Sequence, residues 1–305
     1  MGAAGSAHGQ SAYPAKSIRL IVPATTGGPS DIVARLLGEK LAAALGKPVV
    51  VDNRPGASNT LGMTLVAKAD ADGYTLLQAP ANIATVQILM TDLPFDPVKD
   101  FAPVSLTNLT PCVFVVSGQS SVKSLAELIK YIKGNPGKIT YTSSGPGSPQ
   151  ILATLLFAKM AGGLGALTEV PYKGSSAAYP DVIANRVSYM IDPLAGCTPH
   201  IRAGLLRALA VTTPQRNAAF PDLPTAAEAG LPGYYFASWS GIFAPAGTPR
   251  AVVQKLNSEI VTALNAPDIR KRFGDMGLEA KHSSPEAFGK FLQAEISRYG
   301  ALLKQ

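Results

Sequence analysis

Short apolar runs alternate with helical segments along almost the whole chain, and this alternation limits the fold more than any other feature. Residues 18–23 form a short, β-branched run closed by Pro and Gly, which predicts a strand. Apolar residues then recur at helical spacing until Gly46, a plausible C-terminal stop. Strands are predicted again at 48–53 and 74–79, with a helix between them. This order predicts an α/β fold with a parallel sheet covered on both faces.

The same alternation starts again in the middle of the chain. A strand at 111–117 opens the second series, and the chain ends in two helices, 249–265 and 285–304. We therefore expect two α/β lobes, with the chain crossing between them near 111–116 and again near 234–243. Two crossings predict a hinge. The expected division is lobe 1 from 13–112 plus 240–305, lobe 2 from 113–239, and an unstructured tail from 1–12.

Composition excludes several classes of function. Hydrophobic residues make up 47% of the chain and charged residues only 15%, which is typical of a globular protein. The formal charge of +7 comes from scattered Lys and Arg residues, without the basic and aromatic interleaving of a nucleic-acid surface. With three histidines and no CxxC spacing, neither a metal site nor a cofactor is predicted. Whether Cys112 and Cys197 pair is left open by the sequence.

The apolar runs and the first residues of the chain indicate whether it carries a membrane span or a signal peptide. No stretch approaches the roughly 18 apolar residues of a membrane span. The opening residues, 1–14, lack the basic and apolar regions of an intact signal peptide, and they are interpreted as the start of a mature or trimmed chain.

Glycine-containing turns follow several of the predicted strands. They lie at Gly27-Gly28, 143–148, 173–176 and 192–196. Ligands of open α/β sheets bind outside the carboxyl ends of the strands, and helix N-termini there offer free N–H groups to an anion. These turns predict a site for a carboxylate or phosphate, although each turn alone is also compatible with ordinary turn chemistry.

The turn at Gly27-Gly28 is the one whose residue types indicate most clearly how a ligand would bind. Gly28 is predicted near the N-cap and Pro29 at the first helical position. Gly27 and Gly28 would let a ligand approach the backbone without interference from a Cβ atom. Asp31, in the first turn, is expected to satisfy backbone donors. Further hydroxyl donors in the segment are Thr25, Thr26 and Ser30.

Catalytic alternatives find little support in the sequence. The segment SSGPGS has neither P-loop nor GxSxG spacing. Asp181 and Asp192 do not pair with a base at a recognisable spacing. His200 follows Pro199 at a predicted helix start, where a structural role is expected. Trp239, the single tryptophan, is predicted either in the core or on a wall of the cleft.

Ordered motifs from Tyr13 to Lys304 carry a family resemblance. They are YPAKSIRLIVPATTGGPSDIVARLL, GKPVVVDNRPGAS, ADADGYTLL, FDPVKDFAPVSL, VPYKGSSAAYPDVIANRV, PHIRAGLLRALAVTT, PDLPTAAEAGLPGY and SWSGIFAPAGTP. On these motifs the chain resembles the periplasmic substrate-binding proteins of tripartite tricarboxylate transporters, the Bug-type solute receptors.

The resemblance implies a fold and a function. The fold would be that of a type II periplasmic binding protein, a Venus flytrap of two α/β lobes. It would close on a small organic carboxylate and present it to the permease subunits of a membrane transporter. The resemblance also implies a monomeric periplasmic receptor that is not an enzyme and binds no nucleic acid, with no catalytic residues and no metal or cofactor. A ligand sensor of a two-component system, or an α/β enzyme acting on carboxylates, remains an alternative.

In this family the carboxylate is held by backbone N–H groups, hydroxyls and waters, and the matching positions here define the expected site. These positions are Pro23, Thr25, Thr26, Gly27, Gly28, Ser30, Ala81, Asn82, Ser143, Ser144, Gly147, Ser148, Gln150, Tyr172, Lys173, Gly174 and Asp192.

The sequence departs from the family pattern near this site. Ser58-Asn59 stands where a Gly pair is common, Ile151 where a His is frequent, and Pro193 where an Asn usually follows Asp192. Tyr172 and Ile151, together with Trp239, could support an aromatic ring. The ligand is therefore expected to be a di- or tricarboxylate or an aromatic carboxylate.

Overall fold

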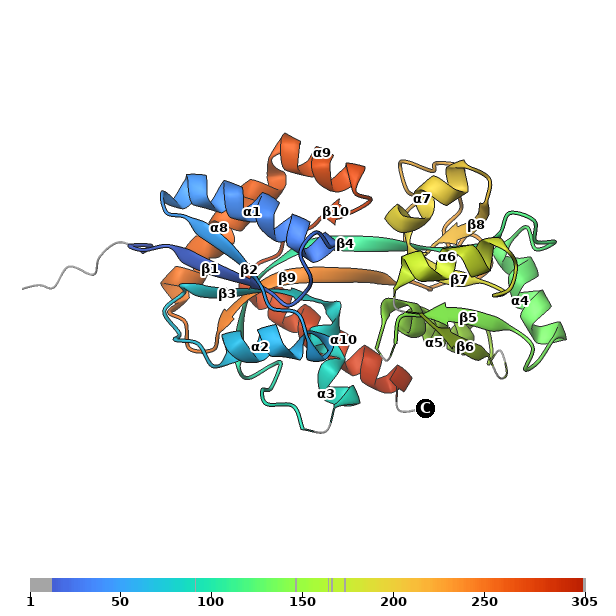
Figure 1. Cartoon of the computed structure of the whole chain (residues 1–305), viewed down its shortest axis with the longest axis horizontal. Helices are drawn as coiled ribbons and strands as arrows, with labels where there is room; N and C mark the ends of the chain where they lie inside the picture. The colour runs from blue at the N-terminus through green and yellow to red at the C-terminus, as the bar shows by residue number, and fades with distance from the viewer. Residues whose placement is uncertain are drawn as a thin grey trace, which may run out of the picture.

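The computed structural model describes residues 13–90, 92–145, 147–163, 165, 167–172 and 174–303. Two α/β lobes lie side by side along the longest axis of the molecule, as expected (Figure 1). The tail predicted for residues 1–12 lies outside the described residues, as does Lys173.

The sheet of lobe 1 is mixed, not parallel. Its strands, in spatial order, are β10 (Glu279–Ala280), β4 (Phe101–Ser117), β9 (Ala237–Pro245), β3 (Thr75–Pro80), β1 (Ile18–Val22) and β2 (Val49–Asn53). Strand β1 runs parallel to β2 and β3, whereas β9 is antiparallel to both β3 and β4. The parallel arrangement predicted for the strands at 18–23, 48–53 and 74–79 is confirmed by β1, β2 and β3. The sheet is mixed because β9 and β10, far from these strands in the sequence, run antiparallel to their neighbours.

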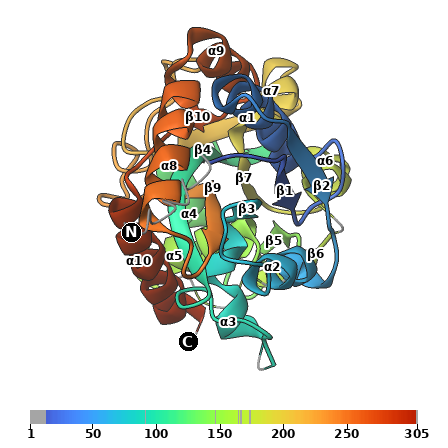
Figure 2. The same ribbon diagram turned by 90° about the vertical axis from the view of Figure 1, so that its left-hand side faces the viewer.

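Helices cover both faces of this sheet (Figure 2). Apolar residues of the helices α1, α8 and α9 share a buried cluster with Ile18, Leu20 and Ile242, and those of α2 and α10 share another with Ile21 and Leu77. Helix α9 was not predicted. The helices of lobe 1 are α1 (Pro29–Leu45), α2 (Thr60–Ala67), α3 (Val86–Leu89), α8 (Arg250–Asn265), α9 (Pro267–Asp275) and α10 (Pro285–Leu303), and two 3-10 turns are η1 (Ala57–Asn59) and η2 (Ala81–Ala84).

Helix α1 begins and ends as its sequence predicts. Gly28 is the N-cap, and Pro29 occupies the first helical position, where its missing N–H costs nothing. Gly46 adopts a left-handed conformation (φ 66°), and its N–H donates to the carbonyl of Ala42 at 3.0 Å.

Lobe 2 is built around the second half of β4. Strands β7 (Met190–Pro193) and β8 (Leu206–Val211) pair antiparallel with it, while β5 (Thr140–Ser143) and β6 (Thr168–Pro171) form a parallel pair. His200 lies in the last turn of its helix, so the prediction that it stands at a helix start was wrong; Pro199 lies inside that helix. The helices of lobe 2 are α4 (Leu125–Gly134), α5 (Pro149–Met160), α6 (Ser175–Ile183) and α7 (Leu194–Arg202).

The chain crosses between the lobes in two adjacent places. Strand β4 pairs with β9 as far as Pro111 and with β7 from Cys112 onward. Thr212, after β8, donates its N–H to the carbonyl of Cys112 (3.0 Å) and accepts the N–H of Phe236 (2.9 Å), which joins the outgoing and returning segments. The division of the lobes at 112/113 and 239/240 stays a prediction from the sequence; its second boundary lies inside β9.

Two glycines let the lobes touch away from the crossings. A Cβ atom on Gly277 would lie 2.6 Å from Cβ and 2.9 Å from Cα of Ala195, at the start of α7. A Cβ atom on Gly147 would lie 2.4 Å from Cδ1 of Leu89 in α3. The lobes are therefore in contact at both positions, and at Gly277 the backbone of Ala195 leaves no room for a side chain.

The contact at Gly277 predicts the response to one added methyl group. Gly277→Ala should push the lobes apart, because the obstructing atoms include the backbone of Ala195. Small-angle scattering should then report a larger radius of gyration than for the unaltered chain. Gly46→Ala is the matched control, since Gly46 has nearly the same φ (66° against 68°) but no atom within 4 Å of its Cβ position. Equal radii for the two variants would contradict the prediction.

Candidate functional site

The lobe 2 half of the predicted site is organised around a buried carboxylate. Asp192, near the end of β7, is 1% exposed. Its Oδ1 accepts hydrogen bonds from Nε2 of Gln150 (2.7 Å) and Oγ of Ser175 (2.6 Å), and its Oδ2 accepts one from the hydroxyl of Tyr179 (2.8 Å). Gln150 stands in the first turn of α5 and Ser175 in that of α6. Asp192 thus ties two helix starts to one strand end.

Burial governs the protonation of this carboxylate. Removal from water raises the pKa of Asp192 to about 6, and the donors Ser175, Tyr179 and Gln150 oppose this rise by stabilising the charged form. Because these donors occupy its oxygens and its side chain is enclosed, we assign Asp192 to holding other groups in place.

The glycine-rich turn after β5 supplies the neighbouring groups. Ser148 caps α5 by accepting the N–H of Ile151 (3.5 Å). The hydroxyl of Ser143 is buried and donates to Glu169. Ser144 is exposed and donates to Oε1 of Gln150 at 3.0 Å. All three serines therefore have partners within lobe 2.

Tyr172 and Gly174 complete the lobe 2 side. The hydroxyl of Tyr172 donates to Oδ2 of Asp181 at 2.6 Å, and the pKa of Tyr172 is raised to about 12 by burial and by this carboxylate. Gly174 is the N-cap of α6, with φ 146°. These contacts keep the Tyr172 ring beside α6.

The turn after β1 forms the lobe 1 half. Thr25, Thr26 and Gly27 are exposed, while Pro23 is buried under the turn. The N–H of Gly27 donates to Oδ2 of Asp31 at 2.9 Å, which confirms that Asp31 satisfies a backbone donor.

The N–H of Gly28 is also engaged, by the carbonyl of Thr25 at 3.3 Å. The N–H groups of Ser30 and Asp31, at the start of α1, have no carbonyl one turn earlier to accept them. They and the two threonine hydroxyls are the donors this turn can offer to a ligand.

Asn82 lies beside a strained turn that the sequence did not identify as part of the site. Its Nδ2 donates to the carbonyl of Ser58 (2.8 Å), and its buried Oδ1 has no hydrogen-bond partner among the described residues. Ala57, Ser58 and Asn59 all have positive φ (46°, 53° and 76°). The only sequence signal was that Ser58-Asn59 replaces a typical Gly pair. Ala81, next to Asn82, is 8% exposed.

Trp239 belongs to the core. Its ring packs edge-on against Phe288 and Phe291 of α10, its Nε1 donates to Oε2 of Glu295 (3.1 Å), and it is 2% exposed. It therefore cannot form a wall for an aromatic ligand, and Tyr172 and Ile151 remain the candidates for that role.

The two cysteines are free and buried. Cys112 belongs to the apolar cluster that contains Phe114, whereas Cys197 belongs to the cluster with Val113, on the other face of the lobe 2 sheet. Among the described residues no group of His, Cys, Asp and Glu is arranged to hold a metal ion. A search of the same residues finds no helix with the length and hydropathy of a membrane span.

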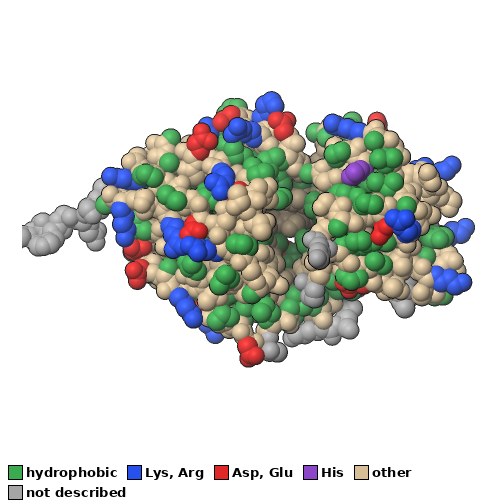
Figure 3. Space-filling model, viewed as in Figure 1, with side chains coloured by type: hydrophobic (Ala, Val, Ile, Leu, Met, Phe, Trp, Pro, Cys, Tyr) green, Lys and Arg blue, Asp and Glu red, His purple; other side chains and the backbone are tan. Residues whose placement is uncertain are grey.

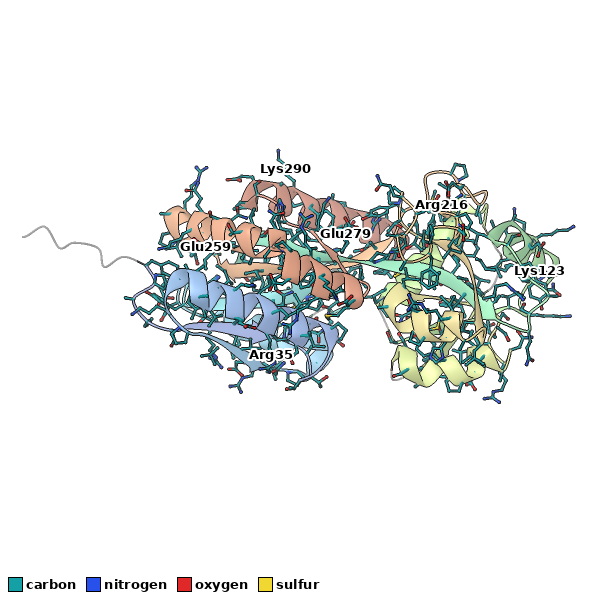
Figure 4. The ribbon with its side chains drawn as sticks, turned by 90° about the horizontal axis from the view of Figure 1, so that it is seen from above. Arg35, Lys123, Arg216, Glu259, Glu279 and Lys290 are labelled. Carbon is teal, nitrogen blue, oxygen red and sulfur yellow. The ribbon has the colours of Figure 1, made fainter. Side chains whose placement is uncertain are left out.

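A hollow separates the lobes on the face shown in Figure 3. A different pocket, of about 1160 Å³, lies where α9 and β10 approach α7. Glu279 and Arg216, which line it from opposite lobes, are labelled in Figure 4. None of the predicted binding residues that the structure describes lines this pocket, so we do not assign the candidate site to it.

Comparison with known proteins gives the chain its family. Residues 33–305 match the tripartite tricarboxylate transporter family receptor. A UPF0065 protein in the tcbD-tcbE intergenic region of Pseudomonas sp. (strain P51) is 38% identical over 293 residues, which cover 96% of this chain and 87% of that protein.

Two solved structures share the fold along nearly the whole chain. R. palustris Rpa4515 with adipate has a TM-score of 0.82 and 37% identity, covering 96% of this chain and 97% of its own. MatC (Rpa3494) from Rhodopseudomonas palustris with bound malate has a TM-score of 0.77 and 33% identity, covering 95% and 99%.

The two-lobed fold is that of a periplasmic binding protein. The chain belongs to the tripartite tricarboxylate transporter receptor family, as its motifs indicated.

The raised pKa of Asp192 predicts a pH dependence of stability. Because the folded pKa (about 6) lies above the unfolded value (3.8), the folded state binds the proton more tightly, so this group lowers stability as pH rises from about 4 to about 6. Asp192→Asn removes that penalty. Relative to the unaltered chain, its free energy of unfolding in urea should rise by up to about 3 kcal/mol between pH 4 and pH 7.

Asp181→Asn is the control for this measurement. Tyr172 and Arg186 lower the pKa of Asp181, so its replacement should shift relative stability in the opposite direction over acidic pH. If the difference in free energy of unfolding between Asp192→Asn and the unaltered chain stayed constant with pH, the pKa of Asp192 would not be raised in the folded state.

Proposed function

We propose that this chain is an extracytoplasmic solute receptor that captures a small organic carboxylate between its lobes. It delivers this ligand to the membrane subunits of a tripartite tricarboxylate transporter. The observation that supports the proposal is the hydrogen bonding at the helix starts of both lobes. Asp31 holds the turn before α1, and Asp192 holds the first turns of α5 and α6, which leaves main-chain donors for a ligand. The bound adipate and malate of two relatives support a carboxylate as the ligand.

Backbone donors are sufficient for useful affinity. Hydrogen bonds to a charged partner contribute roughly 1.5–3 kcal/mol each, so four or five supply on the order of 6–15 kcal/mol before ordering and desolvation. A micromolar dissociation constant requires about 8 kcal/mol. An arginine clamp is therefore unnecessary.

Closure follows from the same geometry. A ligand that contacts both lobes binds the closed state better than the open state, and it shifts the population by that difference in affinity. Release to a permease then requires only that the lobes separate. We place the receptor in the periplasm as a monomer on the strength of its family.

Thermal unfolding with carboxylates tests the proposal. A ligand at about 100 times its dissociation constant should add about 2.7 kcal/mol of stability. Aliphatic di- and tricarboxylates, amino acids and aromatic acids should each be compared with the matching amide. A shift with an acid and none with its amide is the expected result. No shift with any acid would overturn the proposal, and turnover of a bound acid would favour an enzyme.

Gly28→Val tests the lobe 1 half of the site. The φ of Gly28 is −75°, and the nearest atom to its Cβ position is the carbonyl oxygen of Thr25 at 3.4 Å, so the fold should accept the change. The added side chain would stand where a ligand approaches the start of α1, and affinity should fall at least tenfold by calorimetry.

Gly134→Val is the matched control for that variant. Gly134 ends α4 and has no atom within 4 Å of its Cβ position. Its variant should bind like the unaltered chain. Full affinity in Gly28→Val would show that the ligand does not approach this turn.

A further inference from the structure

The two strands that cross between the lobes alternate polar and apolar residues in matched register. Where β4 and β9 pair, residues with polar side chains face one another, and so do residues with large apolar side chains. The pairs along the ladder are Asn108 with Ser240, Leu109 with Trp239, and Thr110 with Ser238.

The apolar face of this ladder is covered. Trp239 packs on α10, with its ring 5.8 Å from that of Phe288 and 5.2 Å from that of Phe291. Leu109 packs against the same apolar cluster and lines the pocket beside β10, as Phe291 does. Because side chains alternate across a strand, the polar face points away from α10 and from that pocket.

The polar face lies on the side of the sheet where α1 begins. Ser240 is two and four residues before Ile242 and Ala244, which pack in the cluster shared by β1 and α1. The turn that opens α1 is the lobe 1 half of the candidate site.

Hydrogen bonding along this face leaves two hydroxyl hydrogens without an acceptor among the described residues. Ser240 donates to Oδ1 of Asn108 at 2.6 Å, and Nδ2 of Asn108 donates to Oγ1 of Thr110 at 3.3 Å. The Thr110 hydroxyl therefore accepts a hydrogen bond from Asn108, and its own hydrogen can still be donated to another acceptor. The Ser238 hydroxyl has no hydrogen bond within the described part of the chain. Both Thr110 and Ser238 are partly exposed, whereas Asn108 and Ser240 are buried.

We propose that Thr110 and Ser238 form a second binding position at the floor of the cleft, which takes an oxygen acceptor at the far end of the ligand. This inference rests on the proposed function and narrows it to a ligand with two acceptor ends, a dicarboxylate. One carboxylate meets the helix starts, and the other receives the two hydroxyl hydrogens.

The position of this pair gives it a separate role from the helix starts. Thr110 and Ser238 lie on the crossing strands, next to the hinge, so they are reached before the lobes close. They select the ligand in the open state. Contacts between the ligand and the helix starts of the two lobes then stabilise the closed state.

Calorimetry with two matched series of acids tests this assignment. The probes are succinate, glutarate and adipate, each compared with the monocarboxylate of the same chain length. Thr110→Val and Ser238→Ala remove one hydroxyl each with little change in volume. Each should weaken the tightest dicarboxylate about tenfold or more and leave the monocarboxylates unchanged.

Thr262→Val is the control, because Thr262 lies exposed on α8 and its hydroxyl donates only to the carbonyl of Ser258. Unaltered dicarboxylate affinity in Thr110→Val and Ser238→Ala would overturn the inference while leaving the proposed function intact. Equal losses for mono- and dicarboxylates, or preference of the unaltered chain for monocarboxylates, would also overturn it. Failure of the unaltered chain to bind any acid would instead sink the proposed function.

Discussion

Both lobes depend on one strand. Strand β4 is 17 residues long, about 56 Å if fully extended, and it supplies a central ladder to each lobe in turn. Its first part pairs with β9 and its second part with β7 and β8. The change of partners falls at Pro111 and Cys112. Pro111 has no N–H to donate to a ladder, and the N–H of Cys112 turns to the hydroxyl of Thr212 at 3.0 Å. The hinge is therefore a place where the ladder changes partner without breaking the strand.

Helix α10 limits how this hinge can bend. The buried Glu295 accepts the indole N–H of Trp239 on β9 and a hydrogen bond from Arg298 at 3.0 Å. Arg298 also donates to the carbonyl of Tyr235, just before β9, at 3.3 Å. Loss of either partner of a buried ion pair strongly destabilises a fold, because it leaves an unpaired charge away from water. The Glu295–Arg298 pair therefore anchors β9 to helix α10. The places left for bending are therefore the Pro111–Cys112 step of β4 and the residues that lead into β9, next to Thr110 and Ser238.

The sequence predicted the local elements better than their pairing. The strand and cap signals around α1 were sufficient because they involve neighbours in the chain, as at Gly28 and Gly46. The antiparallel course of β9 depends on a partner more than 100 residues away, which periodicity cannot show. The start of helix α7 was predicted too late, because Pro199 indicated a first helical position although it lies inside the helix. For the site, sequence patterns located the turns, but they did not show which side chains hold each turn in place and which groups are left for a ligand. Only burial and distance reveal that Asp192 holds Gln150 and Ser175.

The separate roles of side chains and main-chain groups explain how an uncharged site can suit an anion although the carboxylates of Asp31 and Asp192 lie close by. Asp31 is matched by the N–H of Gly27 and by Arg35 at 2.9 Å, and Asp192 by three donors, so their charges are neutralised or spread within each lobe. The side chains of Gln150 and Ser175 are thereby committed to the protein, and the main-chain N–H groups at the helix starts are left for the ligand. Such donors are fixed by the fold and cost no side-chain entropy on binding. Thr110 and Ser238 differ from them, because their hydroxyls are uncommitted side-chain donors on the strands that join the lobes. Main-chain donors recognise a carboxylate wherever it occurs, whereas these two hydroxyls can distinguish one acid from another.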